Sequence, residues 1–416
     1  MDSVLRQIDW SAVDRSIAAR LPATVGVLAA LVGERSTLGD EAGAQRIVQR
    51  ELELLGFAVE LRDVDHALLR DEPASGYPLV DYRDRPIVIG RRSGTSRRSL
   101  LIQGHVDVVP AGAEALWTTP PYAASEREGW LYGRGSGDMK GGIAMALLAL
   151  AALQEVAPAA LDGALSFASV IEEECGGNGA LAALLAGAVA DGVVIPEPTG
   201  LDLLVGGVGV LWVEVEVARA SAHAGHPLPG MSALDAALAI ADALRQLAAG
   251  FERDDAATRP PSERYHVNIG TLTAGEWISN MPAQARLGAR VGYPSALSPA
   301  EAQDRVLAAI LAVDPSAGVR FTGFRAEGYL LADDDPLVAA LVRAHRHAHD
   351  VMPVASSGSA TNDARFYARR GIPAVCFGPT CRNIHGVDEG VELASVAAGA
   401  RTLARLSPGW LHGEPS

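Results

Sequence analysis

The segments SLLIQGHVDVVP (residues 99–110) and YGRGSGDMKGG (residues 132–142) decide the fold of this chain. The first starts with a short apolar run that breaks at a glycine, a pattern typical of a buried strand. His105 and Asp107 follow, and because side chains alternate along a strand, these two point the same way. An imidazole and a carboxylate at a strand end suit a metal ligand and the group that orients it. In the second segment, Asp138 follows three glycines at alternate positions and precedes an apolar helix.

Two other interpretations of these segments stay open at this point. A lone His-x-Asp pair is more often a hydrogen-bonded surface pair than a metal site. The glycine-rich segment could also be a phosphate loop, but it has neither the Gly-x-Gly-x-x-Gly spacing nor a Gly-Lys-Ser/Thr ending. The metal hypothesis therefore needs ligands from elsewhere in the chain.

Further polar side chains follow other predicted core strands. The strand Leu165–Ile171 ends in three consecutive glutamates, Glu172–Glu174, which repel one another unless solvent or a cation compensates them. Glu197 follows the strand that ends at Ile195, and His385 lies beyond a strand at Ala374–Phe377. Ligands of open α/β sheets bind outside the carboxyl ends of the strands. This shared placement predicts one joint site.

Composition restricts the class of protein. The 416 residues carry a formal net charge of −15, which argues against nucleic-acid partners and anionic membrane surfaces. Three cysteines without framework spacing indicate a reducing compartment. The N-terminus lacks a basic region and a signal core, and the apolar run Ile143–Leu153 is too short to span a bilayer. We expect a cytoplasmic protein of about two or three domains.

The predicted order of strands and helices changes at residue 206 and returns to the first pattern at residue 326. Alternating strands and helices predict an α/β/α sandwich built from residues 1–205 and 326–416. Between them, residues 206–325 read as strand, helix, two strands, helix and strand, which predicts an inserted ferredoxin-like α+β domain. The polar, Pro-containing segment 252–264 is predicted to be a loop of this insertion.

Together these segments resemble the dinuclear-zinc amidohydrolase and metallopeptidase family of acetylornithine deacetylase, succinyl-diaminopimelate desuccinylase, aminoacylase and glutamate carboxypeptidase. The likeness extends from about Tyr82 to Glu392 and is closest to the acetylornithine deacetylase-like branch. It implies a metal-dependent amidohydrolase that cleaves the amide bond of an N-acyl amino acid. It also implies that the insertion is a lid through which the chain forms a homodimer.

The resemblance implies a set of five metal ligands. His105 and Glu197 would bind one divalent ion, and Glu174 and His385 the other. Asp138 would bridge the two. Nitrogen and oxygen donors without sulfur suit Zn²⁺ and also Co²⁺ or Mn²⁺.

The resemblance also implies two catalytic roles near the metals. Asp107 would orient His105. Glu173 would be the general base that takes a proton from a metal-bridging water. The family usually has Asp-Glu-Glu where this chain has three glutamates, and Cys175-Gly176 sets the register. A slip of one residue would exchange the roles.

The lid and a glycine-containing loop supply the remaining candidates. His223, in Ser-Ala-His-Ala-Gly, resembles the family's lid histidine, which reaches the partner subunit's site and stabilises the oxyanion. The predicted substrate-binding residues are Asn280, Arg290, Gly358, Thr361 and Arg365. The alternative for Arg290 is a surface arginine on a strand, and the alternative for Arg365 is a structural pair with Asp363.

Other functions remain as alternatives. The same site could serve a dipeptidase, an aminopeptidase or a carboxypeptidase acting on small peptides. A catalytically inactive relative that binds metabolites is the alternative from another class. The sequence does not identify the acyl group, the amino acid or the native metal.

Overall fold

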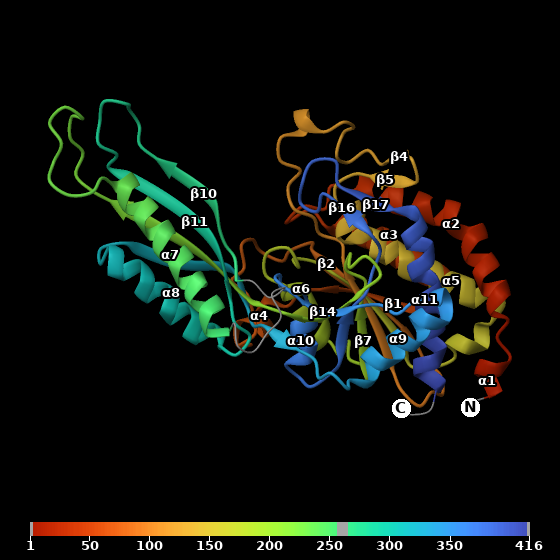
Figure 1. Ribbon diagram of the computed structural model, residues 1–416. Helices are drawn as coiled ribbons and strands as arrows, with labels where there is room; N and C mark the ends of the chain where they lie inside the picture. The colour runs from red at the N-terminus through yellow and green to blue at the C-terminus, as the bar shows by residue number, and fades with distance from the viewer. Residues whose placement is uncertain (1–2, 256–264, 414–416) are drawn as a thin grey trace.

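The computed structural model describes residues 3–255 and 265–413, which form a large α/β body and a smaller elongated one (Figure 1). The large body is built on a nine-stranded mixed sheet. In spatial order its strands are β1 (Ala58–Asp63), β2 (Pro86–Arg92), β6 (Leu165–Val170), β3 (Leu100–His105), β7 (Gly192–Ile195), β15 (Ala374–Cys376), β8 (Leu203–Gly207) and β13 (Tyr329–Leu330), with β14 (Ala355–Gly358) also paired to β8.

Helices cover this sheet on both faces. The crossover from β3 to β6 and the crossover from β6 to β7 run in opposite directions along the sheet, so right-handed connections place their helices on opposite faces. The helix of the first crossover, α5 (Gly141–Val156), packs against α2 (Trp10–Gly33) and α11 (Leu393–His412). The helix of the second, α6 (Asn178–Leu185), packs against α4 (His66–Arg70) and α10 (Ala364–Ala368). The helices are α1 (Ser3–Arg6), α2 (Trp10–Gly33), α3 (Ala42–Leu54), α4 (His66–Arg70), α5 (Gly141–Val156), α6 (Asn178–Leu185), α9 (Pro336–His349), α10 (Ala364–Ala368) and α11 (Leu393–His412).

A small antiparallel sheet lies beside the large one and holds two loops of the candidate site. Its strands, in spatial order, are β16 (Cys381–Arg382), β17 (Gly390–Glu392), β5 (Trp130–Tyr132) and β4 (Ser125–Arg127). Single turns of 3₁₀-helix occur at Glu114–Leu116 and Pro158–Leu161, and a π-helical turn spans Ser136–Lys140. Because β5 pairs with β17, the chain after Tyr132 and the chain before Gly390 lie side by side.

The smaller body, which we call the lid, has the predicted order of elements. Its antiparallel sheet has the order β10 (Val267–Ala274), β11 (Gln284–Tyr293), β9 (Gly209–Ala218) and β12 (Gly318–Ala326), and the helices are α7 (Ala233–Asp255) and α8 (Pro299–Val313). The lid has a hydrophobic core of its own, separate from that of the large body. The predicted fold, a catalytic α/β domain with a lid, is confirmed. The exact division at residues 206 and 325 stays a prediction.

One prediction in the lid is partly wrong. The segment 252–264 was expected to be a loop, but α7 continues to Asp255. The apolar face of this helix includes Phe251, which is buried against the lid core, so packing extends the helix into polar sequence. Residues 256–264 lie outside the described part of the chain.

Two helical segments are long and apolar enough to cross a membrane by length and composition, Trp10–Gly33 and Ser136–Val156. The second is longer than the apolar run seen in the sequence, because the π-helical turn precedes α5 directly. Most of its apolar window is buried inside the protein, as in the core helix of an α/β fold.

Candidate metal and active site

The ends of three parallel strands bring the predicted ligands together. β3 lies between β6 and β7 and runs parallel to both. The register pairs His105 with Val170, so the glutamates that follow β6 emerge beside His105. Glu197 follows β7 at the same edge of the sheet. These residues therefore lie together at the carboxyl ends of the strands, where ligands of open α/β sheets bind.

Asp138 lies between the two predicted histidine ligands. Its Oδ1 is 3.3 Å from Nε2 of His105, and its Oδ2 is 3.2 Å from Nε2 of His385. The two oxygens of one carboxylate thus face two different imidazoles. Asp138 sits in the π-helical turn before α5, and the peptide bond that follows it is cis.

One glutamate stands beside each histidine. Oε2 of Glu174 is 3.0 Å from Nε2 of His385. Oε1 of Glu197 is 3.8 Å from Nε2 of His105. His105, Asp138 and Glu174 each offer an atom to a group whose members lie within 4.8 Å of one another, close enough to share a metal ion.

Asp107 fixes the orientation of His105 and of Glu174. The Nδ1 of His105 is 3.0 Å from the backbone oxygen of Asp107 and 3.5 Å from its carboxylate. With Nδ1 engaged in this way, Nε2 is left to face the carboxylates. The other carboxylate oxygen of Asp107 accepts a hydrogen bond of 3.1 Å from the backbone N–H of Glu174.

The three consecutive glutamates have different surroundings. Glu172 has a positive φ of 67° and turns into the protein, where it accepts hydrogen bonds from Tyr82 and Asn178 and lies 3.5 Å from Arg85. Glu173 is buried, with Oε2 4.0 Å from Nε2 of His105. The structure thus places the second and third glutamates in the site and the first behind it.

The clustered carboxylates of the site favour bound protons or metal ions. Burial raises the pKa of Glu173 and of Glu197 well above the usual range, and burial together with Asp138 raises the pKa of Glu174 to about 7. Burial opposes protonation of His385, but hydrogen bonds to Asp138 and Glu174 outweigh it and raise its pKa to about 11. Packed carboxylates of this kind are stabilised by protons or by metal ions.

Unsatisfied atoms at the site fit a metal. Nε2 of His105 and Oε1 of Glu197 are buried and form no hydrogen bond within the residues that the structure describes. Buried polar atoms are normally paired, and metal coordination is one way to satisfy them. The donor atoms are imidazole nitrogens and carboxylate oxygens, which suit Zn²⁺.

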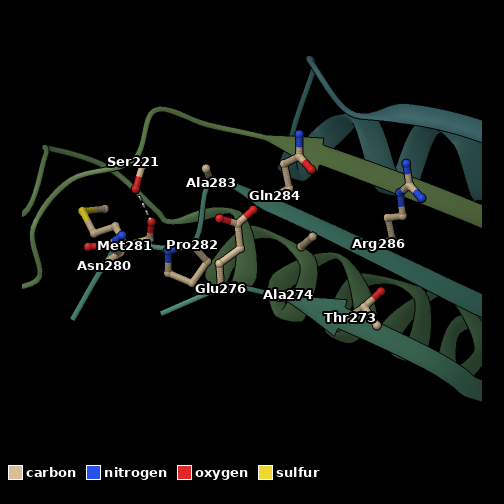
Figure 2. A pocket seen from close by; sticks show the side chains of 12 residues that line it. Ser221, Thr273, Ala274, Glu276, Asn280, Met281, Pro282, Ala283, Gln284 and Arg286 are labelled. Atoms are coloured by element: carbon tan, nitrogen blue, oxygen red, sulfur yellow. Dashed lines mark hydrogen bonds between the residues drawn. The ribbon is translucent and has the colours of Figure 1, made fainter. Parts of the chain in front are cut away.

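The lid candidates lie apart from these ligands. His223 is exposed and forms an isolated bridge with Asn280. Figure 2 shows Asn280 on the rim of a lid pocket, where Ser221 donates a hydrogen bond of 3.1 Å to the backbone oxygen of Met281. Among the described residues, neither His223 nor Asn280 takes part in the close contacts of His105 or His385.

The two arginine candidates differ in what they contact. Arg290 on β11 is half-buried and donates a hydrogen bond of 3.4 Å to the backbone oxygen of Ser359, next to Gly358 at the end of β14. Burial lowers its pKa. Arg365 is buried and donates to the backbone oxygens of Gly176 and Asn362 at 2.9 and 2.8 Å.

Thr361 belongs to the surroundings of Arg365. Its hydroxyl is 3.4 Å from a guanidinium nitrogen of Arg365, and Asp363 lies 3.9 Å from the same group. The guanidinium of Arg365 thus ties the loop at Thr361–Asp363 to the turn that follows Glu174. This arrangement favours the structural interpretation of Arg365 over substrate binding.

Sequence reasoning gave no role to two buried charged residues close to the ligands. They are Arg134 and Glu389. Arg134 lies within the glycine-rich segment and Glu389 four residues after His385, so their positions beside motif residues were the available signal.

Comparison with known proteins agrees with this geometry. Residues 101–407 match the family described as peptidase family M20/M25/M40. A succinyl-diaminopimelate desuccinylase of Paracoccus denitrificans (strain Pd 1222) is 30% identical over 345 residues, covering 79% of this chain and 87% of the relative.

Solved structures share the fold. An M20 family metallo-carboxypeptidase from Sulfolobus solfataricus superposes with a TM-score of 0.75 at 15% identity, covering 92% of this chain and 98% of its own. A Bacillus subtilis protein described as a dinuclear metal binding peptidase from the M20 family gives a TM-score of 0.59 at 16% identity, covering 95% and 99%. The match over most of the sequence and the His/Asp/Glu group lead to one conclusion: this chain belongs to peptidase family M20/M25/M40 and is a hydrolase of amide or peptide bonds.

Proposed function

We propose that this protein is a dinuclear metal-dependent amidohydrolase that removes the acyl group from an N-acyl amino acid. The observation that carries the proposal is the position of Asp138, whose two carboxylate oxygens face His105 and His385 separately. A carboxylate placed in this way between two histidines is suited to bridge a pair of metal ions.

Each ion would have its own ligands besides Asp138. His105 and Glu197 would hold one ion, and Glu174 and His385 the other. When bound, two divalent ions lower the pKa of a water molecule and polarise the scissile carbonyl. Zn²⁺ is the preferred choice, with Co²⁺ and Mn²⁺ as alternatives that the same donor atoms accept.

Glu173 would move the proton. Its carboxylate lies at the edge of the ligand group, 4.0 Å from Nε2 of His105, and it is buried away from bulk water. Glu173 would accept a proton from the attacking water and deliver it to the leaving amine, so that a carboxylate and a free amine result.

Substrate recognition would come from the lid and from the loop after β14. Arg290 has only a backbone oxygen of Ser359 as its hydrogen-bond acceptor within the described chain, so guanidinium N–H groups remain for a substrate carboxylate. Gly358, Thr361 and Asn280 would supply further contacts. The desuccinylase relative supports a substrate with carboxylates on both sides of the amide.

The proposal includes a cytoplasmic homodimer. The exposed position of His223 on the lid suits a histidine that stabilises the oxyanion in the partner's site. The reduced state of Cys175, Cys376 and Cys381 suits the cytoplasm.

The experiment is amine release from a panel of N-acetyl, N-formyl and N-succinyl amino acids and dipeptides. The protein is loaded with Zn²⁺ or Co²⁺, and a chelator-treated sample is the control. We expect chelator-sensitive release from one acyl class. Cleavage of dipeptides alone would replace the proposal with a peptidase. No release from a protein shown to hold two metal ions would favour an inactive metabolite-binding relative.

A further inference from the structure

A buried ion pair lies behind the loops that carry Asp138 and His385. Arg134 and Glu389 are each 1% exposed. Nη1 of Arg134 is 2.5 Å from Oε2 of Glu389. Neither residue lies within the group of predicted ligands. Their bonds instead go to the backbone around it.

Glu389 accepts hydrogen bonds from the turn that presents Asp138. Its Oε1 accepts the backbone N–H of Gly137 at 2.9 Å and of Asp138 at 3.0 Å. Its Oε2 accepts the backbone N–H of Gly135 at 3.1 Å. Both carboxylate oxygens of Glu389 therefore accept hydrogen bonds, and they fix the path of the backbone at Asp138.

Arg134 makes the corresponding bonds to the loop of His385. Its Nη2 donates hydrogen bonds to the backbone oxygens of His385 and Gly386 at 3.2 and 3.1 Å. The same nitrogen is 3.5 Å from the backbone oxygen of Pro110, in the segment that continues from Asp107. The guanidinium of Arg134 thus contacts the loop of His385 and the segment that follows His105. Its partner Glu389 holds the turn that carries Asp138.

The loop of His385 needs such support. His385 has a φ of 60°, and Asn383 and Asp388 have φ values of 53°. This left-handed region is unfavourable for residues with a Cβ, so surrounding contacts must maintain it. The bond from Arg134 to the backbone oxygen of His385 acts at the residue whose side chain faces Asp138.

We propose that Arg134 and Glu389 are positioning residues that hold Asp138 and His385 at metal-binding distance. The proposal rests on the ligand roles given under Proposed function. It adds a claim about affinity: without the pair, the chain folds but binds the metal that involves His385 more weakly. A merely structural ion pair would contribute to stability and leave metal affinity unchanged.

The test is Glu389→Gln, studied by Co²⁺ and Zn²⁺ titration of the full-length, metal-free protein. Glutamine has the same shape, but its amide N–H₂ would face backbone N–H donors, so the turn at Asp138 must shift. Removing a partner behind metal ligands typically weakens metal binding 10–100-fold. We expect an increase of about that size in the dissociation constant for at least one ion, together with an altered visible absorption spectrum of bound Co²⁺.

Two further variants separate positioning from stability. Arg405→Met removes another ion pair, in which Arg405 makes two contacts of 2.9 Å with Asp14 between α11 and α2, away from the ligands. It is expected to lower the unfolding temperature without changing the metal dissociation constants. Arg134→Lys keeps a positive charge beside Glu389 but loses the forked contacts, and is expected to weaken metal binding less than Glu389→Gln does.

The outcomes distinguish this proposal from the proposed function. If the unmodified protein binds two ions and Glu389→Gln binds them with dissociation constants within twofold, the positioning role is wrong and the function stands. If the unmodified protein fails to bind two ions, the ligand set itself is wrong. If Glu389→Gln does not fold, the same criteria apply to Arg134→Lys.

Discussion

The pKa of the buried carboxyl of Asp363, close to the site, can be tested quantitatively. The residue is 1% exposed, and its Oδ2 accepts a hydrogen bond of 3.0 Å from Gln103. Its Oδ1 has no hydrogen-bond partner in the described residues, and Arg365 approaches only to 3.9 Å. Burial raises the pKa of Asp363 from 3.8 to about 7, although Arg365 and His105 oppose the change.

The direction of the pH effect follows from this raised pKa. Between pH 3.8 and about 7, the folded protein retains a proton at Asp363 that the unfolded chain releases. The stabilisation from that proton is fully present below pH 3.8 and is lost as the pH rises through about 7. Asp363→Asn has no proton to lose at this position. Relative to the unmodified protein, the variant should gain roughly 3 kcal/mol in unfolding free energy between pH 5 and pH 8.

The assay is urea unfolding of the metal-free protein in EDTA at a series of pH values. Asp242→Asn is the control, because it makes the same substitution at an exposed aspartate beside Arg245, away from the buried group. Addition of Zn²⁺ should shrink the effect at Asp363, since nearby cations favour the ionised carboxylate. A difference between Asp363→Asn and the unmodified protein that stays constant from pH 5 to pH 8 would show that Asp363 is already ionised in the fold. The reasoning about burial would then be wrong.

Three further predictions concern catalysis. Glu173→Ala should abolish turnover while isothermal titration still detects two metal ions; loss of the ions would mean that the register of the glutamates is wrong. His223→Ala should lower kcat by roughly 10²–10³-fold if it stabilises an oxyanion, and near-normal activity would remove it from the mechanism. Arg290→Met should raise KM at least tenfold for a substrate with a carboxylate, whereas Arg286→Met, on an exposed position of the same strand, should leave KM unchanged. Equal effects of the two arginine variants would argue against a substrate contact at Arg290.

The sequence signals for the candidate site are local. Strand ends followed by polar residues mark His105, the glutamates after β6, and Glu197, and parallel neighbours in a sheet place such ends together. The hydrophobic pattern also predicted the order of elements in the lid. Both inferences need only the alternation of apolar and polar residues along one segment.

Other features depend on contacts between distant segments. β14 is a short strand of small residues, of which the first two are exposed, and it pairs with β8. The role of Arg365 could not be read from its loop, since its acceptor, the backbone oxygen of Gly176, lies 189 residues away in sequence. Glu389 is still more remote, 251 residues from Asp138 in the turn that it holds.

Six carboxylates in and around the site divide into two groups by their partners, and this division argues for the metals. Glu172, Glu389 and Asp363 each have an arginine within 4.0 Å. Asp138, Glu174 and Glu197 face imidazoles, and none of them forms an ion pair with an arginine or lysine in the described chain. Three ligand carboxylates with neutral imidazoles bring a charge of −3, which two divalent cations and one hydroxide would neutralise. Arginines of the protein thus lie beside three carboxylates outside the proposed ligand set, whereas the proposed ligand carboxylates have no arginine or lysine partner among the described residues.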